Sequence, residues 1–176
     1  MAAIRGMMAC SLDGFAADAS GGVDWLTPFD AVDWGYATFI DQIGTVVMGR
    51  LTYQHMLDLT PDWPYPGKRG IVVGRGLTGP LRGDAEIWPN GLPALIAELR
   101  GLEQDAWVVG GPMLQAAFLQ AGALDRLELC LVPRLLGRGL RVFPEAVPGP
   151  QPRLAGLREM PMGLVMLDYR FDGPSG

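Results

Sequence analysis

Three short apolar runs that each end in glycine constrain the fold of this chain more than any other feature. They are Val46-Val47-Met48-Gly49, Val72-Val73-Gly74 and Val108-Val109-Gly110-Gly111. Short runs of β-branched residues are typical of strands buried on both faces, as in a parallel sheet flanked by helices. Ligands of such sheets bind outside the carboxyl ends of the strands, where glycine lets the backbone approach a phosphate closely. The repeat therefore predicts an α/β sheet with a ligand cleft at one edge, although each glycine turn can also serve the fold alone.

Helical and strand patterns alternate over the first two thirds of the chain. The apolar spacing predicts helices over residues 30–43, 51–59, 92–102 and 112–122. Short apolar runs predict strands over residues 4–12, 45–48, 71–73, 86–88 and 107–109. Near the end, predicted strands follow one another without a helix between them, over residues 127–132, 154–160 and 164–171. We expect a mostly parallel sheet with an antiparallel edge, in one domain over residues 1–172 with a tail over 173–176.

Composition excludes several classes of protein. The chain has 176 residues, 49% of them apolar, with a net charge of −5 and no run of basic residues. Nucleic acid and anionic membranes are therefore not expected partners. No apolar stretch is long enough to span a bilayer and no signal-peptide pattern is present, so we expect a cytoplasmic protein. The two cysteines, Cys10 and Cys130, lie far apart without metal-ligand spacing, which predicts buried free thiols and no metal site.

The glycine runs also predict the type of ligand. Pro112, directly after Gly110-Gly111, can open a helix whose free N–H groups and dipole favour a diphosphate. Residues 49–52, Gly-Arg-Leu-Thr, offer a second helix start with a guanidinium and a hydroxyl, and Gly74-Arg75 adds another arginine. Arginine suits a ribose 2′-phosphate, whereas NAD sites usually carry an acidic residue that is missing after both Gly-Arg pairs. We therefore expect NADPH as the cofactor.

One sequence match points to a different fold but fails in context. Residues 74–79, Gly-Arg-Gly-Leu-Thr-Gly, fit the dinucleotide fingerprint G-x-G-x-x-G. Pro80 and the glycine- and aspartate-rich stretch after it leave no helix for a phosphate to meet. A Rossmann-fold dehydrogenase is therefore disfavoured.

Three carboxylates are candidates for acid–base chemistry. Asp13 ends the first strand, and Asp24 and Asp33 lie across the following loop. Reduction of an imine or carbonyl-derived centre needs a proton, which a partly buried carboxylate with a raised pKa can relay. Asp13 as a turn former and Asp33 as a solvent-facing helix charge are the structural alternatives. Ser11 and Trp25 are the candidate substrate contacts, and a core role for Trp25 is equally open.

Several motifs occur together in a characteristic order. They are Ser11-Leu12-Asp13-Gly14-Phe15-Ala16-Ala17, Asp24-Trp25-Leu26, Met48-Gly49-Arg50-Leu51-Thr52-Tyr53, Gly110-Gly111 and Leu136-Gly137-Arg138-Gly139-Leu140-Arg141-Val142-Phe143. On these residues the chain resembles the dihydrofolate reductase-like superfamily. It is most similar to stand-alone relatives of the reductase domain of the bifunctional riboflavin-pathway deaminase/reductase. The resemblance implies a three-layer fold with a mixed sheet of about eight strands and NADPH across the strand ends.

The same resemblance implies roles for individual residues. It places ten residues on the cofactor: Gly49, Arg50 and Thr52 at its phosphates, Gly74 and Arg75 near the 2′-phosphate, and Gly110, Gly111, Pro112, Met113 and Leu114 along the diphosphate. The family commonly has a hydroxyl residue where Gly74 stands. The resemblance also implies a cis bond between the two glycines at 110 and 111. Because related domains form homodimers, we expect a two-fold dimer through strands within residues 127–171.

The function that follows is an NADPH-dependent reductase of a small planar heterocycle. The resemblance makes it most like 5-amino-6-(5-phosphoribosylamino)uracil reductase of riboflavin biosynthesis, or a dihydrofolate reductase-like enzyme. The alternative is a nucleotide-binding module that keeps the cleft without catalysis. The sequence contains no zinc-deaminase signature, so another protein would supply any deamination step.

Overall fold

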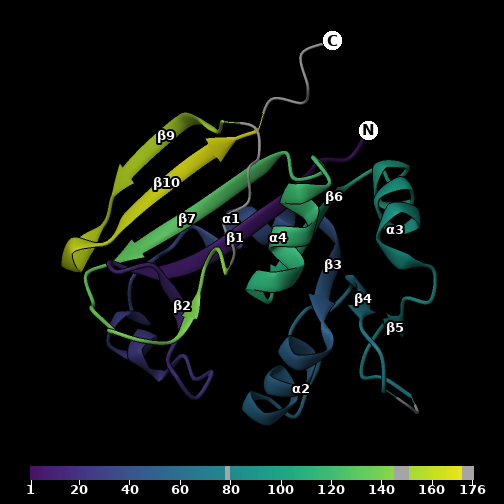
Figure 1. The fold of residues 1–176 in the computed structure, drawn as a ribbon, viewed down its shortest axis with the longest axis horizontal. Coiled ribbons are helices and arrows are strands. Elements are labelled where there is room, and N and C mark those ends of the chain that lie inside the picture. Colours follow the sequence, from purple (N-terminus) through teal and green to yellow (C-terminus); the bar gives the residue numbers. More distant parts are fainter. Residues whose placement is uncertain (78–79, 145–150, 172–176) are drawn as a thin grey trace.

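The computed structural model describes residues 1–77, 80–144 and 151–171. The strands of its main sheet are β1 (Ile4–Ser11), β3 (Ile43–Gly49), β4 (Arg69–Val73), β5 (Ala85–Ile87), β6 (Asp105–Gly110), β7 (Arg126–Val132), β9 (Arg153–Glu159) and β10 (Val165–Arg170). Within the described ranges these eight strands lie in the order β5-β4-β3-β6-β1-β7-β10-β9 (Figure 1). Neighbours from β5 to β7 are parallel, and β10 is antiparallel to both β7 and β9. The predicted mostly parallel sheet with an antiparallel edge is confirmed.

Helices cover both faces of this sheet. They are α1 (Tyr36–Asp41), α2 (Arg50–Leu59), α3 (Gly91–Arg100) and α4 (Pro112–Gln120). Side chains of α3 and α4 pack with Val47 and Val108 in one core cluster, whereas α1 and α2 pack with Val46 and Met48 in another. Because successive strand residues point to opposite faces, the two clusters lie on opposite sides of the sheet. The result is the predicted three-layer arrangement.

The predicted helix over residues 30–43 is wrong in extent. A 3₁₀ helix, η1, occupies Asp24–Phe29, and α1 spans only Tyr36–Asp41. Gly35 has φ +77°, and its N–H donates to the Asp33 carboxylate at 2.8 Å, so the regular helix begins only after this turn. Ile43 is fully buried as the first residue of β3, which leaves Gly44 inside a strand rather than after a helix. Burial of Ile43 in the sheet therefore determined the structure here, although the spacing of apolar residues is typical of a helix.

A small second sheet was not predicted from the sequence. It joins β2 (Phe15–Ala17) to β8 (Leu140–Arg141) in antiparallel pairing. Val142 N–H also donates to the Gly14 carbonyl at 3.0 Å, so the loop after β7 is fixed to the turn after β1. This contact brings residues that are far apart in sequence to the end of the first strand.

The remaining expected elements lie within a few residues of their predicted bounds. The turn between the last two strands is a 3₁₀ helix, η2 (Pro161–Gly163). Among the described residues, no helix is long and apolar enough to cross a membrane. The expected tail over residues 173–176 lies outside the described residues. The single domain and the cytoplasmic location stay predictions.

One part of the sheet carries exposed apolar side chains. The register aligns Leu129 of β7 with Leu167 of β10 and Leu157 of β9, so their side chains share one face. This is the face on which α4 packs, because Leu129 contacts the cluster that contains α4 residues. Figure 1 shows α3 and α4 over the other end of the sheet, away from β9 and β10. Leu157 is 59% exposed and Leu154 is 48% exposed.

Candidate functional site

The three glycine turns lie at one edge of the sheet. Gly49 pairs with Val73 of β4, and Met48 pairs with Gly110 of β6. Because β4, β3 and β6 are parallel neighbours, their carboxyl ends meet there. The three glycine turns therefore meet at one edge of the sheet, and the ligand cleft expected there stays a prediction. We call this region the strand-end site, defined by residues 49–52, 74–75 and 110–114.

Two helices begin directly at this edge. α2 starts after Gly49 and α4 after Gly111, and neither start has a side-chain cap. The first backbone N–H groups of α2 therefore remain available. In α4, Pro112 has no N–H and the Leu114 N–H donates to the Gly111 carbonyl at 3.0 Å, so the Met113 N–H is the one that remains. The positive ends of both helix dipoles add to these groups. The peptide bond between Gly110 and Gly111 is cis, as the family resemblance implies.

Close packing explains the glycines at two of these positions, 74 and 111. A Cβ atom added to Gly111 would stand 3.3 Å from the Thr52 hydroxyl, and one added to Gly49 would stand 3.7 Å from the Gly111 nitrogen. Gly74 has φ +145°, and its added Cβ would be only 2.9 Å from Cβ of Arg50. The three turns thus lie close to one another. A side chain at position 74 or 111 would require its neighbours to move, whereas one at position 49 would make only ordinary contact.

The predicted cofactor residues differ in accessibility. Arg75 is exposed with no hydrogen-bond partner within the described ranges, whereas Arg50 donates to Gln54 Oε1 at 2.9 Å. Met113 is 64% exposed at the start of α4. Leu114 instead packs against the core cluster beneath the helix. Arg75 is therefore the side chain with the most freedom to meet a phosphate.

Ser11 and Asp13 form a closed hydrogen-bonded turn at the end of β1. The Ser11 hydroxyl donates to Asp13 Oδ1 at 2.6 Å and accepts from the Phe15 N–H at 2.9 Å. Asp13 also accepts from the N–H groups of Leu136 at 3.1 Å and Gly137 at 2.7 Å. Ser11 is fully buried. Its predicted contact with substrate therefore has no open surface in this structure.

The pKa of Asp13 is lowered, whereas a proton relay would need a raised pKa. The hydrogen bond from Ser11 is the largest cause, and with the N–H groups of Gly137 and Leu136 it lowers the Asp13 pKa to about 2. Hydrogen bonds to a carboxylate favour its charged form. The expected raised pKa is therefore wrong for Asp13, which instead fastens the loop after β7 to the first strand.

The other two carboxylates are separate from this turn. Asp24 is exposed in the first turn of η1, and exposed Asp33 accepts the Gly35 N–H before α1. Among the described residues, no hydrogen bond or ion pair joins either one to Asp13. Trp25 is half-buried against the cluster of Phe29, Val32, Cys130, Val132, Met160, Leu164 and Met166, and its indole N–H is buried without a described partner. This packing agrees with the alternative in which Trp25 is part of the hydrophobic core.

Neither a metal centre nor a reactive thiol emerges from the described residues. They contain no cluster of three or more histidine, cysteine or acidic side chains that could hold a metal. Cys10 and Cys130 are both free and buried, as expected. Burial raises the pKa of both thiols, that of Cys130 to about 12, so they are protonated at neutral pH.

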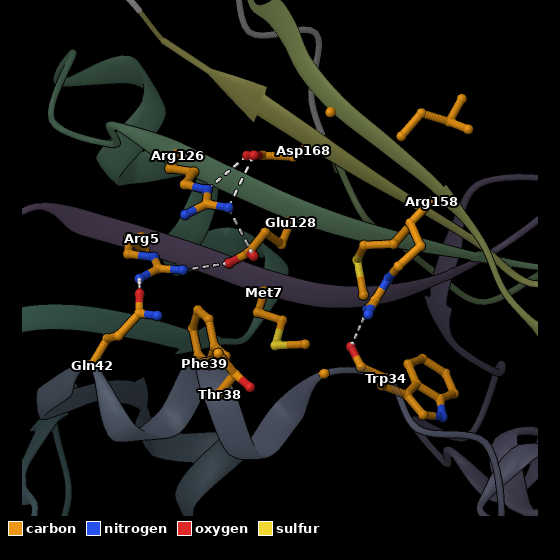
Figure 2. Close-up of a pocket in the computed structure, with 14 residues that line it drawn as sticks. Arg5, Met7, Trp34, Thr38, Phe39, Gln42, Arg126, Glu128, Arg158 and Asp168 are labelled. Atoms are coloured by element: carbon orange, nitrogen blue, oxygen red, sulfur yellow. Dashed lines mark hydrogen bonds and ion pairs between the residues drawn. The ribbon is translucent and has the colours of Figure 1, made fainter.

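A cavity that the sequence did not predict lies on the face of the sheet that α1 covers. Its volume is about 370 Å³, and it is formed between α1 and the sheet face of β1, β7, β10 and β9. Five charged side chains line it: Arg5, Arg126, Glu128, Arg158 and Asp168 (Figure 2). The only sequence signal was their occurrence on predicted strands, because their grouping depends on the register of four strands.

Comparisons with known proteins agree with this architecture. The profile of the RibD C-terminal domain matches residues 2–166. The uncharacterized protein YwjB of Bacillus subtilis (strain 168) is 33% identical over 155 residues, which cover 86% of this chain and 88% of YwjB. A putative riboflavin biosynthesis protein from Shewanella sp. PV-4 superposes with a TM-score of 0.86 at 26% identity, covering 97% of this chain and 99% of that one.

A more distant structure shares the fold. Dihydrofolate reductase from Enterococcus faecalis, solved with NADP(H), superposes with a TM-score of 0.69 at 17% identity. The match covers 96% of this chain and 95% of the reductase. The dihydrofolate reductase-like architecture expected from the motifs is confirmed.

Proposed function

The chain belongs to the RibD C-terminal domain family, and from this premise we propose that it is an NADPH-dependent reductase of a planar heterocycle. The substrate class is that of 5-amino-6-(5-phosphoribosylamino)uracil reductase in riboflavin biosynthesis, or of dihydrofolate reductase-like enzymes. The similarity to a putative riboflavin biosynthesis protein and to a reductase solved with NADP(H) supports this class.

The observation that carries the proposal is the pair of uncapped helix starts against glycine strand ends. The first N–H groups of α2 after Gly49 and the Met113 N–H of α4 suit the two charges of a diphosphate. The glycines leave room for it, since an added Cβ at Gly111 would already approach Thr52. Arg75, exposed beside this edge, suits the 2′-phosphate that distinguishes NADPH from NADH. The residues present therefore fit the dinucleotide.

When bound, NADPH supplies a hydride, and the protein must position the acceptor and provide a proton. With a pKa near 2, Asp13 is ionised at neutral pH and has no proton to donate. We therefore assign Asp13 a positioning role: its carboxylate holds Leu136 and Gly137 beside the end of β1. The proton then comes from Asp24, Asp33 or water.

The first experiment measures cofactor preference. We expect NADPH to bind more tightly than NADH in calorimetric titrations, and Arg75→Ala to reduce that preference ten-fold or more. The reason is the loss of a charge-assisted contact worth about 1.5–3 kcal/mol. Arg170→Ala, an exposed arginine at the far end of β10, is the control and should keep the wild-type preference. Equal affinity of the wild type for both nucleotides would contradict the proposal.

A second measurement separates the enzyme from the non-catalytic alternative. Purified protein is mixed with NADPH and candidate pterins or ribityl-pyrimidines, and the nicotinamide absorbance is followed. Substrate-dependent loss of absorbance identifies the reductase. Tight NADPH binding without turnover on any candidate supports a nucleotide-binding module instead.

A further inference from the structure

Arg75 lies on the loop that joins β4 to β5, residues 74–84, and the first part of this loop lies against α2. A Cβ atom added to Gly74 would stand only 2.9 Å from Cβ of Arg50, the first residue of that helix. The loop and the helix supply different parts of the strand-end site. Arg75 suits the 2′-phosphate, whereas the first N–H groups of α2 suit the diphosphate.

Tyr53, in the first turn of α2, holds the later part of the same loop. Its hydroxyl accepts the backbone N–H of Arg82 at 2.8 Å. Tyr53 is 2% exposed, and among residues 50–59, all of which the structure describes, it is the only buried side chain. Leu77 and Leu81 of the loop pack against the same core cluster as its ring. Because the ring is enclosed, its hydroxyl is a fixed attachment point for the loop.

Arg82 also binds the other end of the helix. Its Nη1 donates to the carbonyl of Thr60 at 3.1 Å and to that of Pro61 at 2.7 Å, directly after the last turn of α2. A cation there satisfies free carbonyl groups and interacts favourably with the helix dipole. The backbone and the side chain of this one residue thus join the loop to both ends of α2. We call these three hydrogen bonds the Arg82 clasp.

The Arg82 clasp matters to a ligand only if that ligand touches both the helix and the loop. NADH has a diphosphate but no 2′-phosphate, so it offers Arg75 no phosphate, whereas NADPH has a group for each part of the strand-end site. Two binding groups that are already held at the right separation lose less conformational entropy when one ligand engages both. The clasp should therefore strengthen the binding of NADPH and leave that of NADH unchanged.

We propose that Tyr53 is a positioning residue for cofactor selection, because its hydroxyl holds the loop of Arg75 at the separation from α2 that NADPH requires. The inference rests on the proposed function and deepens it, by adding to the selection of NADPH a residue that acts through Arg82. The ring of Tyr53 is buried in the core cluster, so its effect on the nucleotide is indirect.

The contact itself can be tested without any nucleotide. Tyr53→Phe removes the hydroxyl and keeps the buried ring, so this variant should fold. Tyr65→Phe is the matched control, since Tyr65 packs against the same core cluster and its hydroxyl has no described hydrogen bond. We expect the Arg82 N–H to exchange its hydrogen faster in Tyr53→Phe than in the wild type or in Tyr65→Phe. Equal exchange in all three proteins would overturn the inference.

Calorimetric titration with NADPH and with NADH tests the selection. We expect Tyr53→Phe to bind NADPH about five-fold more weakly than the wild type, the effect of one lost hydrogen bond, and to bind NADH within about two-fold. Tyr65→Phe should match the wild type with both nucleotides. In the Arg75→Ala background, adding Tyr53→Phe should change NADPH affinity by less than about two-fold, because the loop then has no phosphate contact to position.

The outcomes separate this inference from the proposed function. Equal weakening of both nucleotides in Tyr53→Phe, or a full further loss in the double variant, would show a merely structural role and overturn the inference. Unchanged NADPH affinity in Tyr53→Phe would do the same, and the proposed function would stand if Arg75→Ala still removed the preference of the wild type. A wild type with equal affinity for both nucleotides would contradict the proposed function and the selecting role of Tyr53 together.

Discussion

Asp13 holds two parts of the molecule together through its ionised form. Its carboxylate accepts from Ser11, Leu136 and Gly137, and these bonds lower its pKa from 3.8 to about 2. A carboxyl whose pKa is lower in the folded than in the unfolded state stabilises the fold above its unfolded pKa. That contribution is lost as the pH falls from about 3.8 through about 2.

Asp13→Asn should therefore unfold more easily than the wild type at pH 7. The difference in free energy of unfolding should stay constant down to about pH 4 and shrink between pH 3.8 and 2, as measured by urea denaturation across that range. Asp24→Asn, at an exposed position without a described hydrogen bond, is the control and should follow the wild type. If the two proteins differ in free energy of unfolding by the same amount at pH 7 and near pH 2, the charge of Asp13 does not contribute to stability.

Gln115 is a buried polar residue with unused capacity. It is fully buried in α4, and neither its amide nitrogen nor its oxygen has a partner among the described residues. A Cβ added to Gly6 would stand 2.8 Å from Gln115 Oε1, which shows how closely the amide lies over β1. The unpaired amide should cost stability.

Gln115→Met keeps the length of the side chain and removes the amide. We expect the free energy of unfolding to rise by about 1–3 kcal/mol in urea denaturation. Gln120→Met, on the exposed end of the same helix, should change it little. A loss of stability in Gln115→Met would indicate that a buried water satisfies the amide in solution.

At the level of elements, the β2–β8 sheet depends on one glycine. A Cβ added to Gly139 would stand 2.1 Å from the Ala17 carbonyl oxygen, whereas one added to Gly137, at φ +73°, would meet nothing within 4 Å. An alanine at position 139 would therefore clash with Ala17, whereas an alanine at position 137 would cause only backbone strain.

Gly139→Ala should destabilise the protein by about 3 kcal/mol or more, because the Ala17 backbone must move. Gly137→Ala should cost only about 1–2 kcal/mol, the strain of a left-handed backbone. Thermal and urea unfolding of the two variants measure the difference. Equal losses would mean that β2 and β8 contribute little to the fold.

The same small sheet shows what the sequence could and could not predict. The strands that carry the glycine turns were predictable, because a run such as Val46-Val47-Met48 is a local signal of burial. β2 and β8 span three and two residues, and Phe15 pairs with distant Arg141, so no local pattern marks them. Pairing of this kind depends on tertiary contacts.

Of the two candidate sites, the strand-end site could be predicted from the sequence and the cavity could not. The strand-end site follows from local turns at Gly49 and Gly110, so its backbone could be placed from sequence. The cavity depends on register: Glu128 and Asp168 meet only because β7 and β10 align them across the sheet. The lowered pKa of Asp13 also escaped prediction, because two of its donors lie in a loop more than 120 positions away.

At the scale of the whole molecule, the exposed face of β9 and β10 supports the expected dimer. Leu154 and Leu157 share that face with half-buried Leu167 and Tyr169, and β9 is an edge strand. Contiguous apolar surface of this kind commonly marks an interface. We propose a two-fold dimer in which this face of one copy packs on the same face of another.

Light scattering at micromolar concentration should give twice the mass of the chain. The double variant Leu154→Asp with Leu157→Asp should be monomeric, because the dimer would bury four unpaired charges at its centre. Arg170→Asp makes the same change of net charge at an exposed position on the opposite face of β10, and it should remain a dimer. A monomeric wild type would reject the proposal.

The place of β1 in the sheet has a consequence for synthesis of the chain. Gly6 pairs with Val108 on one side and Leu127 on the other. During translation, the first strand leaves the ribosome long before either neighbour exists, and its closure must wait for contacts of long sequence separation. Such contacts slow folding and leave apolar strands exposed to chaperones or aggregation. β1 is thus made before both of its partners and stays unpaired until β6 and β7 emerge.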